Sequence, residues 1–419
     1  MANVLKLKCS VCGREFSPDE VQYTCPVDGQ IGTLDVLYDY DALKSTIDRD
    51  ALSHELSMWQ TSMWRYKALL PISPDATVPD LRVGYTPLYA SSKLTVDLGV
   101  RQAYIKDDGL NPTGSLKDRA SALVVARAAE ANIEIVSTAS TGNAAAALAG
   151  MCAGMGDAIH AIIFVPASAP EAKIAQLLVY GATVVLVEAS YDVAFDLCYE
   201  LCLSEGWYCR NTGINPYTVE GKKTVAYEIA EQLAWDVPDV VIVSVGDGNI
   251  IAGVHKGFSD LLELGWIERI PRLIGVQAEG SSPLVSAWQK GLDVRDMQPI
   301  DAHTIADSIS AGLPRDRSRA LRAVRETSGA LIAVTDAEII ASIPRLARLT
   351  GVFAEPAAAA VYAGAQRAVK LGLIDKEARV ALLSTGSGLK DVKRAQESVA
   401  GGLRVPPDAQ TIRRALHLI

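Results

Sequence analysis

Lys117 stands where an amine could be held ready for covalent chemistry. It follows Asn111-Pro112-Thr113-Gly114-Ser115-Leu116, a small, polar stretch that favours turns. Ala103-Tyr104-Ile105 indicates the end of a strand before this loop, and Ser115 is expected to cap a helix that continues through Val125. A strand, a loop and a helix would therefore present an amine able to form a Schiff base. The alternative is an ordinary solvated lysine in the first turn of a helix, where the helix dipole disfavours a cation.

Three further loops have the same arrangement of a hydrophobic strand, small residues and a helix. Their strands are predicted at residues 133–136, 240–245 and 380–383, with helices after the first two loops from Ala144 and near Ile250. The loops themselves are residues 137–143 (Ser-Thr-Ala-Ser-Thr-Gly-Asn), residues 246–249 (Gly-Asp-Gly-Asn) and residues 384–391 (Ser-Thr-Gly-Ser-Gly-Leu-Lys-Asp). Backbone N–H groups at such helix starts can converge on an anion. One glycine loop alone is more often a tight turn, whereas four in one chain indicate a shared site.

Together these stretches resemble the fold-type II enzymes that use pyridoxal 5'-phosphate (PLP), and within them the threonine synthase family. The resemblance extends from Gly84-Tyr85-Thr86-Pro87-Leu88 to Gly388-Leu389-Lys390-Asp391, in the family's order throughout. The family's lysine motif is Asn-Pro-Thr-Gly-Ser-Phe-Lys-Asp-Arg, and this chain departs from it only at Leu116. The resemblance therefore implies a PLP-dependent lyase with Lys117 as its Schiff-base and acid–base residue.

The resemblance also implies a role for each loop. Asn143 would bond the ring hydroxyl of the cofactor, and Thr385 would place a neutral hydroxyl against the pyridine nitrogen. Glu355-Pro356-Ala357 resembles another segment that the family places near the cofactor. The cofactor phosphate would be bound by Gly246, Asp247, Gly248, Asn249 and Ile250, and the substrate by Thr113, Ser115, Ser140, Thr141, Gly142, Thr218 and Lys222.

Departures from the family pattern concern the substrate. Thr218 stands where the resemblance expects an arginine that holds the phosphate of O-phosphohomoserine, and a threonine cannot make that bidentate, charge-assisted contact. Lys222 or Lys223 could supply the charge instead, or could be an exposed pair on a helix. The loop at 246–250 is one residue shorter than usual for threonine synthases and in length resembles that of serine and threonine dehydratases. Asp247 is unfavourable beside a phosphate unless its side chain points away or caps the helix.

The leading expectation is therefore a threonine synthase. It would convert O-phosphohomoserine and water to threonine and phosphate through β,γ-elimination and β-addition. The alternative is a threonine or serine dehydratase, or another amino-acid β-elimination or replacement enzyme. A scaffold protein without turnover is a third possibility, disfavoured because Lys117, Asn143 and Thr385 are all present.

The amino-terminal segment carries a separate pattern with the spacing of a zinc ribbon. Cys9 and Cys12 form one pair, and Cys25 is followed by Asp28 where a fourth cysteine would stand. Sets of this kind suit tetrahedral zinc, although carboxylate is a less common structural ligand than thiolate. A structural zinc ion and a ribbon that has lost its metal both remain open.

Composition narrows the class of protein. The chain has 419 residues, a net charge of -9 and seven cysteines, an odd number. With no signal peptide expected, this cysteine usage favours the reducing cytoplasm, and Cys152, Cys198, Cys202 and Cys209 are expected to be buried free thiols. No basic surface for nucleic acid and no membrane span are predicted. A small-molecule amino acid is the expected partner, and a homodimer is the usual form of the family.

Hydrophobic β-branched strands that alternate with helices predict an α/β fold of parallel twisted sheets covered by helices. Such strands are expected at residues 161–165, 182–187, 240–245, 273–276 and 380–383. By resemblance, a small lobe (110–215) would carry the lysine, and a large PLP-binding lobe (46–109 and 216–400) would enclose the cofactor cleft with it. The zinc-ribbon-like module (1–45) and a carboxy-terminal tail (401–419) would flank them, and the stretch from Asp39 to Ala68 would be helical packing or a subunit contact.

Overall fold

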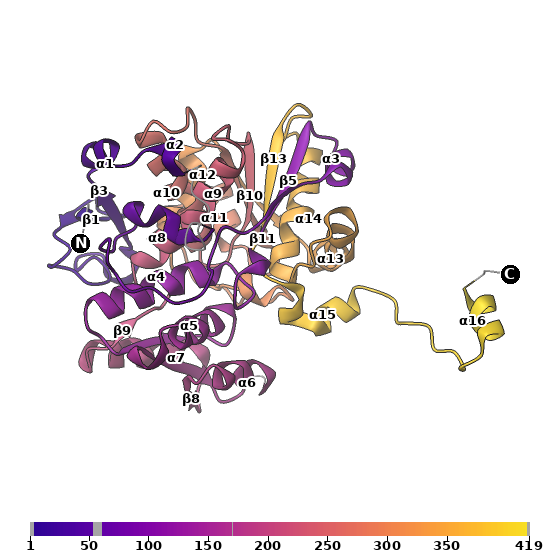
Figure 1. Ribbon diagram of the computed structural model, residues 1–419, viewed down its shortest axis with the longest axis horizontal. Helices are drawn as coiled ribbons and strands as arrows, with labels where there is room; N and C mark the ends of the chain where they lie inside the picture. The colour runs from indigo at the N-terminus through magenta and orange to yellow at the C-terminus, as the bar shows by residue number, and fades with distance from the viewer. Residues whose placement is uncertain (1–3, 53–60, 170, 417–419) are drawn as a thin grey trace.

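The larger of two mainly parallel sheets forms the centre of the molecule (Figure 1). This computed structural model describes residues 4–52, 61–169 and 171–416. The strand order of this sheet is β12-β11-β10-β13-β5-β4, and every pair is parallel except β4 with β5. Its strands are β4 (Leu88–Ala90), β5 (Gln102–Asp107), β10 (Val240–Ser244), β11 (Arg272–Ala278), β12 (Ala330–Val334) and β13 (Arg379–Ser384). The central strands are buried hydrophobic runs, as helices on both faces require.

A second sheet of four parallel strands lies in the order β8-β7-β6-β9. Its strands are β6 (Ile135–Ala139), β7 (His160–Pro166), β8 (Thr183–Val187) and β9 (Tyr208–Cys209). The predicted strand at 133–136 is displaced, because Ser137 and Thr138 belong to β6 rather than to the loop. Both are buried but satisfied: Ser137 Oγ donates to Ile162 O at 2.8 Å and Thr138 Oγ1 to Asn211 Oδ1 at 2.9 Å.

The α/β fold class expected from the sequence is thus confirmed, with one correction. The edge strand β4 runs antiparallel, whereas the expectation was of parallel sheets. β12 and the short β9 were not foreseen. The strands of the smaller sheet all fall within residues 135–209, between β5 and β10 of the larger one. The division into lobes at 110–215 and on either side stays a prediction.

The amino-terminal strands form a small antiparallel sheet in the order β2-β1-β3. They are β1 (Val4–Cys9), β2 (Glu15–Phe16) and β3 (Leu34–Tyr38). This sheet packs on the body of the protein, since Leu34 and Val36 are fully buried in the core shared with the larger elements. Asp35 also pairs with Arg322 at 2.7 Å across that contact.

Helices cover both mainly parallel sheets. α4 (Lys117–Glu130) packs on α5 (Asn143–Ala153) and on α8 (Tyr217–Lys222). Further helices of nine or more residues are α6 (Glu171–Val179), α7 (Tyr191–Ser204), α9 (Thr224–Gln232), α10 (Asn249–Glu263), α12 (Arg317–Glu326), α13 (Asp336–Thr350) and α14 (Pro356–Lys370). Shorter ones are α3 (Ser92–Leu98), α11 (Pro283–Lys290) and α15 (Val392–Glu397). Short 3-10 turns lie at Gly29–Ile31, Asp108–Leu110, Gly156–Ala158, Asp307–Ile309 and Gly388–Asp391.

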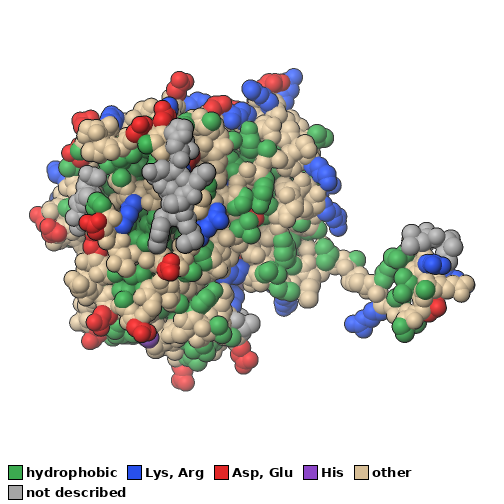
Figure 2. Space-filling model, in the orientation of Figure 1, with side chains coloured by type: hydrophobic (Ala, Val, Ile, Leu, Met, Phe, Trp, Pro, Cys, Tyr) green, Lys and Arg blue, Asp and Glu red, His purple; other side chains and the backbone are tan. Residues whose placement is uncertain are grey.

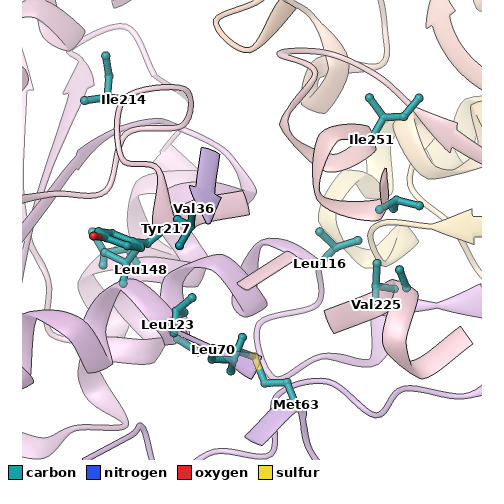
Figure 3. Close-up of a cluster of buried hydrophobic side chains, with 14 of the residues drawn as sticks. Val36, Met63, Leu70, Leu116, Leu123, Leu148, Ile214, Tyr217, Val225 and Ile251 are labelled. Atoms are coloured by element: carbon teal, nitrogen blue, oxygen red, sulfur yellow. The ribbon is translucent and has the colours of Figure 1, made fainter. Parts of the chain in front are cut away.

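One continuous core joins the lysine-bearing helix to the rest. Figure 3 shows Leu116, Leu123, Val225 and Ile251 among the side chains of this cluster, and all four are fully buried. Leu116, which differs from the family's phenylalanine, therefore acts as a core residue directly before Lys117. A second core lies under α14, where the alanines at 357–360 are 0–1% exposed. Small side chains let that helix approach the sheet closely.

The segment before the larger sheet and the carboxy-terminal segment both consist of short helices and turns. The stretch from Asp39 to Ala68 holds α1 (Tyr40–Thr46), α2 (Arg49–Leu52) and a 3-10 turn at Met63–Leu69, and its residues 53–60 lie outside the described residues. The carboxy-terminal segment extends away from the rest of the protein after α15 and contains α16 (Ala409–Ala415), as Figures 1 and 2 show.

Within the described residues, no helix is both long and apolar enough to span a membrane.

Candidate functional site

The predicted loops converge on one cavity of about 710 Å³. It is bounded by the start of α4, the loop between β6 and α5, the loop between β10 and α10, and residues 307–313. Parallel strands bring the loops at their carboxyl ends to one edge of each sheet, which explains the convergence. Of the predicted site residues, those that line the cavity are Lys117, Ser140, Thr141, Gly142, Asn143, Lys222, Gly246, Asp247, Gly248, Asn249 and Ile250.

Lys117 is the first residue of α4, and its side chain lines the cavity. Burial lowers the pKa of its amine below the ordinary lysine value. The nearby carboxylate of Glu355 opposes this shift, while the positive charge of Arg210 adds to it. A lowered pKa makes the neutral amine available, and this is the form that attacks a carbonyl and accepts a proton.

The loop between β10 and α10 has the form of an anion cradle. Gly248 adopts a φ of 89°, a left-handed conformation that a side chain would disfavour, and it ends the loop directly before α10. No side chain among the described residues caps this helix. Its first N–H groups therefore remain free to bind an anion at the positive end of the helix dipole.

Asp247 turns its carboxylate to the protein within this loop. Its Oδ1 accepts from the backbone N–H of Arg315 at 3.2 Å, and its backbone carbonyl accepts from Asp316 N at 2.8 Å. Burial raises the pKa of Asp247, which reduces the charge it would hold against a phosphate. The aspartate thus anchors the loop to the segment that precedes α12.

Asn143 is held by a buried carboxylate across the cavity. Its Nδ2 lies 3.0 Å from both Glu355 Oε1 and Glu355 Oε2, and 3.2 Å from Ser308 Oγ. Glu355 directly precedes α14 and is 4% exposed. This pairing fixes the orientation of the Asn143 amide and leaves its oxygen as the acceptor. Thr385 is 1% exposed, and its hydroxyl lies 3.4 Å from that of Ser244, which lines the cavity.

Three predicted substrate residues lie elsewhere. Thr218 is fully buried in α8 with its hydroxyl on Asn215 O at 2.8 Å, and Thr113 donates from its backbone N–H to Asp118 at 2.7 Å. Neither residue lines the cavity. Ser115 does not line it either, and the expectation that Ser115 caps α4 is wrong. Leu116 occupies the cap position, and the Ser115 hydroxyl is buried with no hydrogen-bond partner among the described residues.

Lys222 and Lys223, which the sequence left open as an exposed pair on a helix, are both buried. Lys222 and Lys223 are 2% and 0% exposed, so the reading of an exposed pair is wrong. The reason is that α8 lies between α4 and α10 rather than at the surface. Lys223 pairs with Glu220 at 2.6 Å and Asp260 at 2.8 Å, away from the cavity. Lys222 donates to Asn249 at the start of α10 and lines the cavity.

Several cavity residues were not foreseen from the sequence. Arg210 is fully buried just after β9 and is among the residues that line the cavity. Arg315 lies 4.5 Å from the centre of the Phe195 ring at the same cavity. Neither belongs to a local strand-loop-helix pattern, so only the position of Arg210 between β9 and the Asn-Pro segment could have drawn attention to it.

These residues fit PLP. The cavity offers an amine of lowered pKa, a helix start without a side-chain cap, and an amide fixed by a carboxylate. Lys117 would hold the cofactor covalently, residues 246–250 its phosphate, and Asn143 and Thr385 its ring. Lys222 adds an amine beside the phosphate cradle through its bond to Asn249, and burial lowers the pKa of this amine.

The amino-terminal cysteines form a second cluster. The ligand atoms of Cys9, Cys12, Cys25 and Asp28 all lie within 4.8 Å of one another. The N–H groups of Val11 and Cys12 point at Cys9 Sγ from 3.4 and 3.5 Å, a contact that stabilises a thiolate. Three sulfurs and one carboxylate oxygen at this spacing fit a tetrahedral zinc ion.

The remaining four cysteines are different. Cys152, Cys198, Cys202 and Cys209 are buried free thiols, as the sequence predicted. Burial raises the pKa of Cys152, which leaves its thiol inert.

Comparison with known proteins agrees with this geometry. The family of pyridoxal-phosphate dependent enzymes matches residues 80–386. Threonine synthases from Methanocaldococcus jannaschii and Methanosarcina acetivorans are 37% and 39% identical to this chain, each over 98% of both chains. The solved structure of processed threonine deaminase isoform 2 from Solanum lycopersicum matches with a TM-score of 0.64 at 24% identity, covering 84% of this chain and 88% of that one. This last likeness concerns the fold alone. The chain therefore belongs to the pyridoxal-phosphate-dependent enzymes and, within them, to the threonine synthase family.

Proposed function

We propose that this protein acts as a threonine synthase, a lyase that converts O-phosphohomoserine and water to threonine and phosphate. The reaction removes protons from Cα and Cβ, expels phosphate from Cγ, adds water at Cβ and returns protons to Cγ and Cα. One observation carries the proposal: Lys117, Asn143 and the loop before α10 face a single cavity in a chain whose threonine synthase relatives match over 98% of its length.

Lys117 would move the protons. Bound PLP supplies the electron sink for the charge that develops at the substrate carbons. The Lys117 amine accepts the proton from Cα because burial lowers its pKa and keeps part of it neutral. The same Nζ can exchange protons at Cβ, since the side chain is unbranched and Lys117 lines the cavity.

The other cavity residues would orient the cofactor and substrate and adjust the charge on the cofactor ring. The Asn143 amide is held by Glu355 through its nitrogen, and its oxygen would be the acceptor for the cofactor ring hydroxyl. Thr385 offers a neutral hydroxyl where a carboxylate would hold a positive charge on a ring nitrogen. Ser140, Thr141 and Gly142 line the same cavity and would supply small polar groups for the α-carboxylate of the substrate.

An amino-acid substrate, a homodimer and a cytoplasmic location complete the proposal. The relatives' shared name supports the first. The assembly and the location rest on the usual form of the family and on the cysteine usage of the sequence.

We also propose that Cys9, Cys12, Cys25 and Asp28 hold one structural zinc ion. Their mutual spacing within 4.8 Å supports this. Asp28 carries a second contact, to Arg295 at 3.3 Å, so the cluster also joins the amino-terminal sheet to the segment after α11.

The activity is tested by proton NMR of the PLP-loaded protein mixed in parallel with O-phosphohomoserine and with threonine. Threonine formed from the first substrate is expected. Lys117→Ala should abolish this activity, while Lys290→Ala, an exposed lysine at the end of α11, should leave it unchanged. Inert O-phosphohomoserine with 2-oxobutyrate formed from threonine would instead establish the dehydratase alternative.

A further inference from the structure

Arg210 is a buried cation that forms no salt bridge with any carboxylate among the described residues. It is 0% exposed. Its Nε donates to Ser121 Oγ and its Nη1 to Thr212 Oγ1, both at 3.0 Å and both neutral oxygens. Its Nη2 is buried with no hydrogen-bond partner among the described residues. Leaving a charged donor buried and unpaired is costly.

Other buried arginines of the chain are neutralised by carboxylates. Arg119 is equally buried and pairs with Asp108 at 2.7 Å, and Arg319 pairs with Asp316 at 2.6 Å. Arg210 has no salt bridge within the part of the chain that the structure describes, and it lines the cavity. A ligand that enters the cavity is therefore the available source of the anion.

The position of Arg210 separates this anion from the cofactor phosphate. Its partner Ser121 lies four residues after Lys117, so both occupy one face of α4. The guanidinium thus lies on the side of the reacting amine. The phosphate cradle is made instead by residues 246–249 and α10, with Lys222 bonded to Asn249 there. The cavity therefore holds two basic side chains on two different elements, and burial together with the charge of Arg210 lowers the pKa of the Lys222 amine.

We propose that Arg210 binds the side-chain phosphate of the substrate and so makes the enzyme specific for phosphorylated amino acids. The inference rests on the proposed function and adds its specificity residue. A guanidinium offers parallel donors that match phosphate oxygens, which Thr218, with its hydroxyl on Asn215, cannot supply. Ser121 and Thr212 hold the fork so that the unpaired Nη2 remains for the ligand.

The test uses PLP-loaded protein and its absorption spectrum. Wild type, Arg210→Gln and Arg210→Lys are titrated with 2-amino-5-phosphonopentanoate, whose carbon–phosphorus bond cannot be eliminated, and with norvaline, the same amino acid without the phosphonate. Arg210→Gln is expected to weaken phosphonate binding about 10- to 100-fold while changing norvaline binding less than about twofold. Arg210→Lys should lie between, because it keeps the charge without the fork.

Two controls keep the result interpretable. Arg272→Gln removes an arginine that bonds backbone carbonyls of Ser328 and Leu373 far from the cavity, and it should bind both ligands as wild type does. Thermal unfolding and cofactor content show whether each variant is folded. If Arg210→Gln is unfolded, the comparison of phosphonate with norvaline binding is made with Arg210→Lys, which keeps the charge.

The outcomes separate the two proposals. Unchanged phosphonate binding in Arg210→Gln, or an equal loss for norvaline and the phosphonate, would overturn the specificity role; the equal loss would assign Arg210 to the α-carboxylate. Wild-type protein that binds the phosphonate yet makes no threonine from O-phosphohomoserine would contradict the proposed activity. The comparison of phosphonate with norvaline would still decide the role of Arg210 in that case.

Discussion

The amine of Lys117 owes its expected reactivity to its surroundings. In water a lysine is protonated at neutral pH and is neither nucleophile nor base. Here burial lowers its pKa, and the carboxylate of Glu355 opposes the shift from across the cavity. Because Glu355 is itself bonded to Asn143, one carboxylate influences both the reacting amine and the amide expected at the cofactor ring.

This lowered pKa predicts how the apoenzyme recovers its cofactor. Only the neutral amine attacks the PLP carbonyl, so the rate of reconstitution should rise with pH through the lowered pKa of Lys117 and level off above it. Stopped-flow absorbance over a pH series measures the pH midpoint of this rate increase. We expect this midpoint to be lower than that for PLP reacting with Nα-acetyl-lysine, whose side-chain amine is free in water. An equal or higher midpoint would show that the cavity does not depress the pKa of Lys117.

The contact between α4 and α8 sets the position of the lysine-bearing helix. Gly221 in α8 lies directly against the backbone of α4, and an added Cβ there would come within 2.2 Å of Arg119 O. Both helices are buried along this contact, and backbone cannot move aside as a flexible side chain can. A glycine far from the chemistry in sequence therefore determines where Lys117 stands.

Gly221→Ala is expected to destabilise the protein by about 1–3 kcal/mol through overpacking and to reduce activity by displacing α4. Denaturant unfolding and kcat/KM measure the two effects. Gly401→Ala is the matched control, because its added Cβ would meet no atom within 4 Å. Wild-type stability in Gly221→Ala would mean that α8 can shift without cost.

A zinc ion bound by Cys9, Cys12, Cys25 and Asp28 should stabilise the amino-terminal sheet. The purified protein is expected to contain about one zinc ion per chain by elemental analysis, and a chelator should lower its thermal unfolding temperature. Cys12→Ala should lose the metal with little direct loss of packing, because Cys12 is the exposed ligand. Cys202→Ala, outside the cluster, should retain it. Metal-free protein with an unchanged unfolding temperature on chelation would indicate a ribbon that works without metal.

A buried ionic cluster ties the lysine-bearing helix to the larger sheet. Arg119 of α4, Lys106 of β5 and Glu228 of α9 have fully buried side chains. Glu228 Oε2 accepts from Lys106 at 2.6 Å and from Arg119 at 2.8 Å. Asp108, after β5, completes the neutralisation of Arg119. Segments separated by more than a hundred residues thus share one set of charges.

Glu228→Gln should destabilise the fold by about 3 kcal/mol at neutral pH, because it leaves two buried cations underneutralised. Burial alone would raise the pKa of Glu228, but Arg119 and Lys106 lower it to about 2. Its stabilising contribution is therefore complete above the ordinary carboxyl pKa and lost as pH falls toward 2. Urea unfolding over a pH series should show a gentler acid loss in Glu228→Gln than in wild type. Glu263→Gln, at an exposed carboxylate, is the control. If Glu263→Gln lowers the free energy of unfolding as much as Glu228→Gln does, the buried ionic cluster does not contribute specifically to stability.

Most local structure around the cavity was predictable because it is encoded in contiguous residues. The buried run Val240-Val241-Ile242-Val243 followed by glycines predicts a strand and a turn. β10 ends one residue before the predicted strand does, and α10 begins one residue before its predicted start. Boundaries were less certain where polar residues lie in a strand. Ser137 and Thr138 resemble loop residues in sequence, yet partners on β7 and beyond β9 satisfy them inside the sheet.

The amino-acid sequence specified the fold class, the lysine loop and the order of the glycine loops, since each depends on neighbours within a few residues. Tertiary packing decided which side chains reach the cavity. It directed the Thr218 hydroxyl to Asn215, buried Lys222 and Lys223, and brought Arg210 to the cavity with no carboxylate partner in the described part of the chain. Burial and charge pairing depend on segments distant in sequence, such as α4, α8 and α10, and their contacts exist only after the chain has folded.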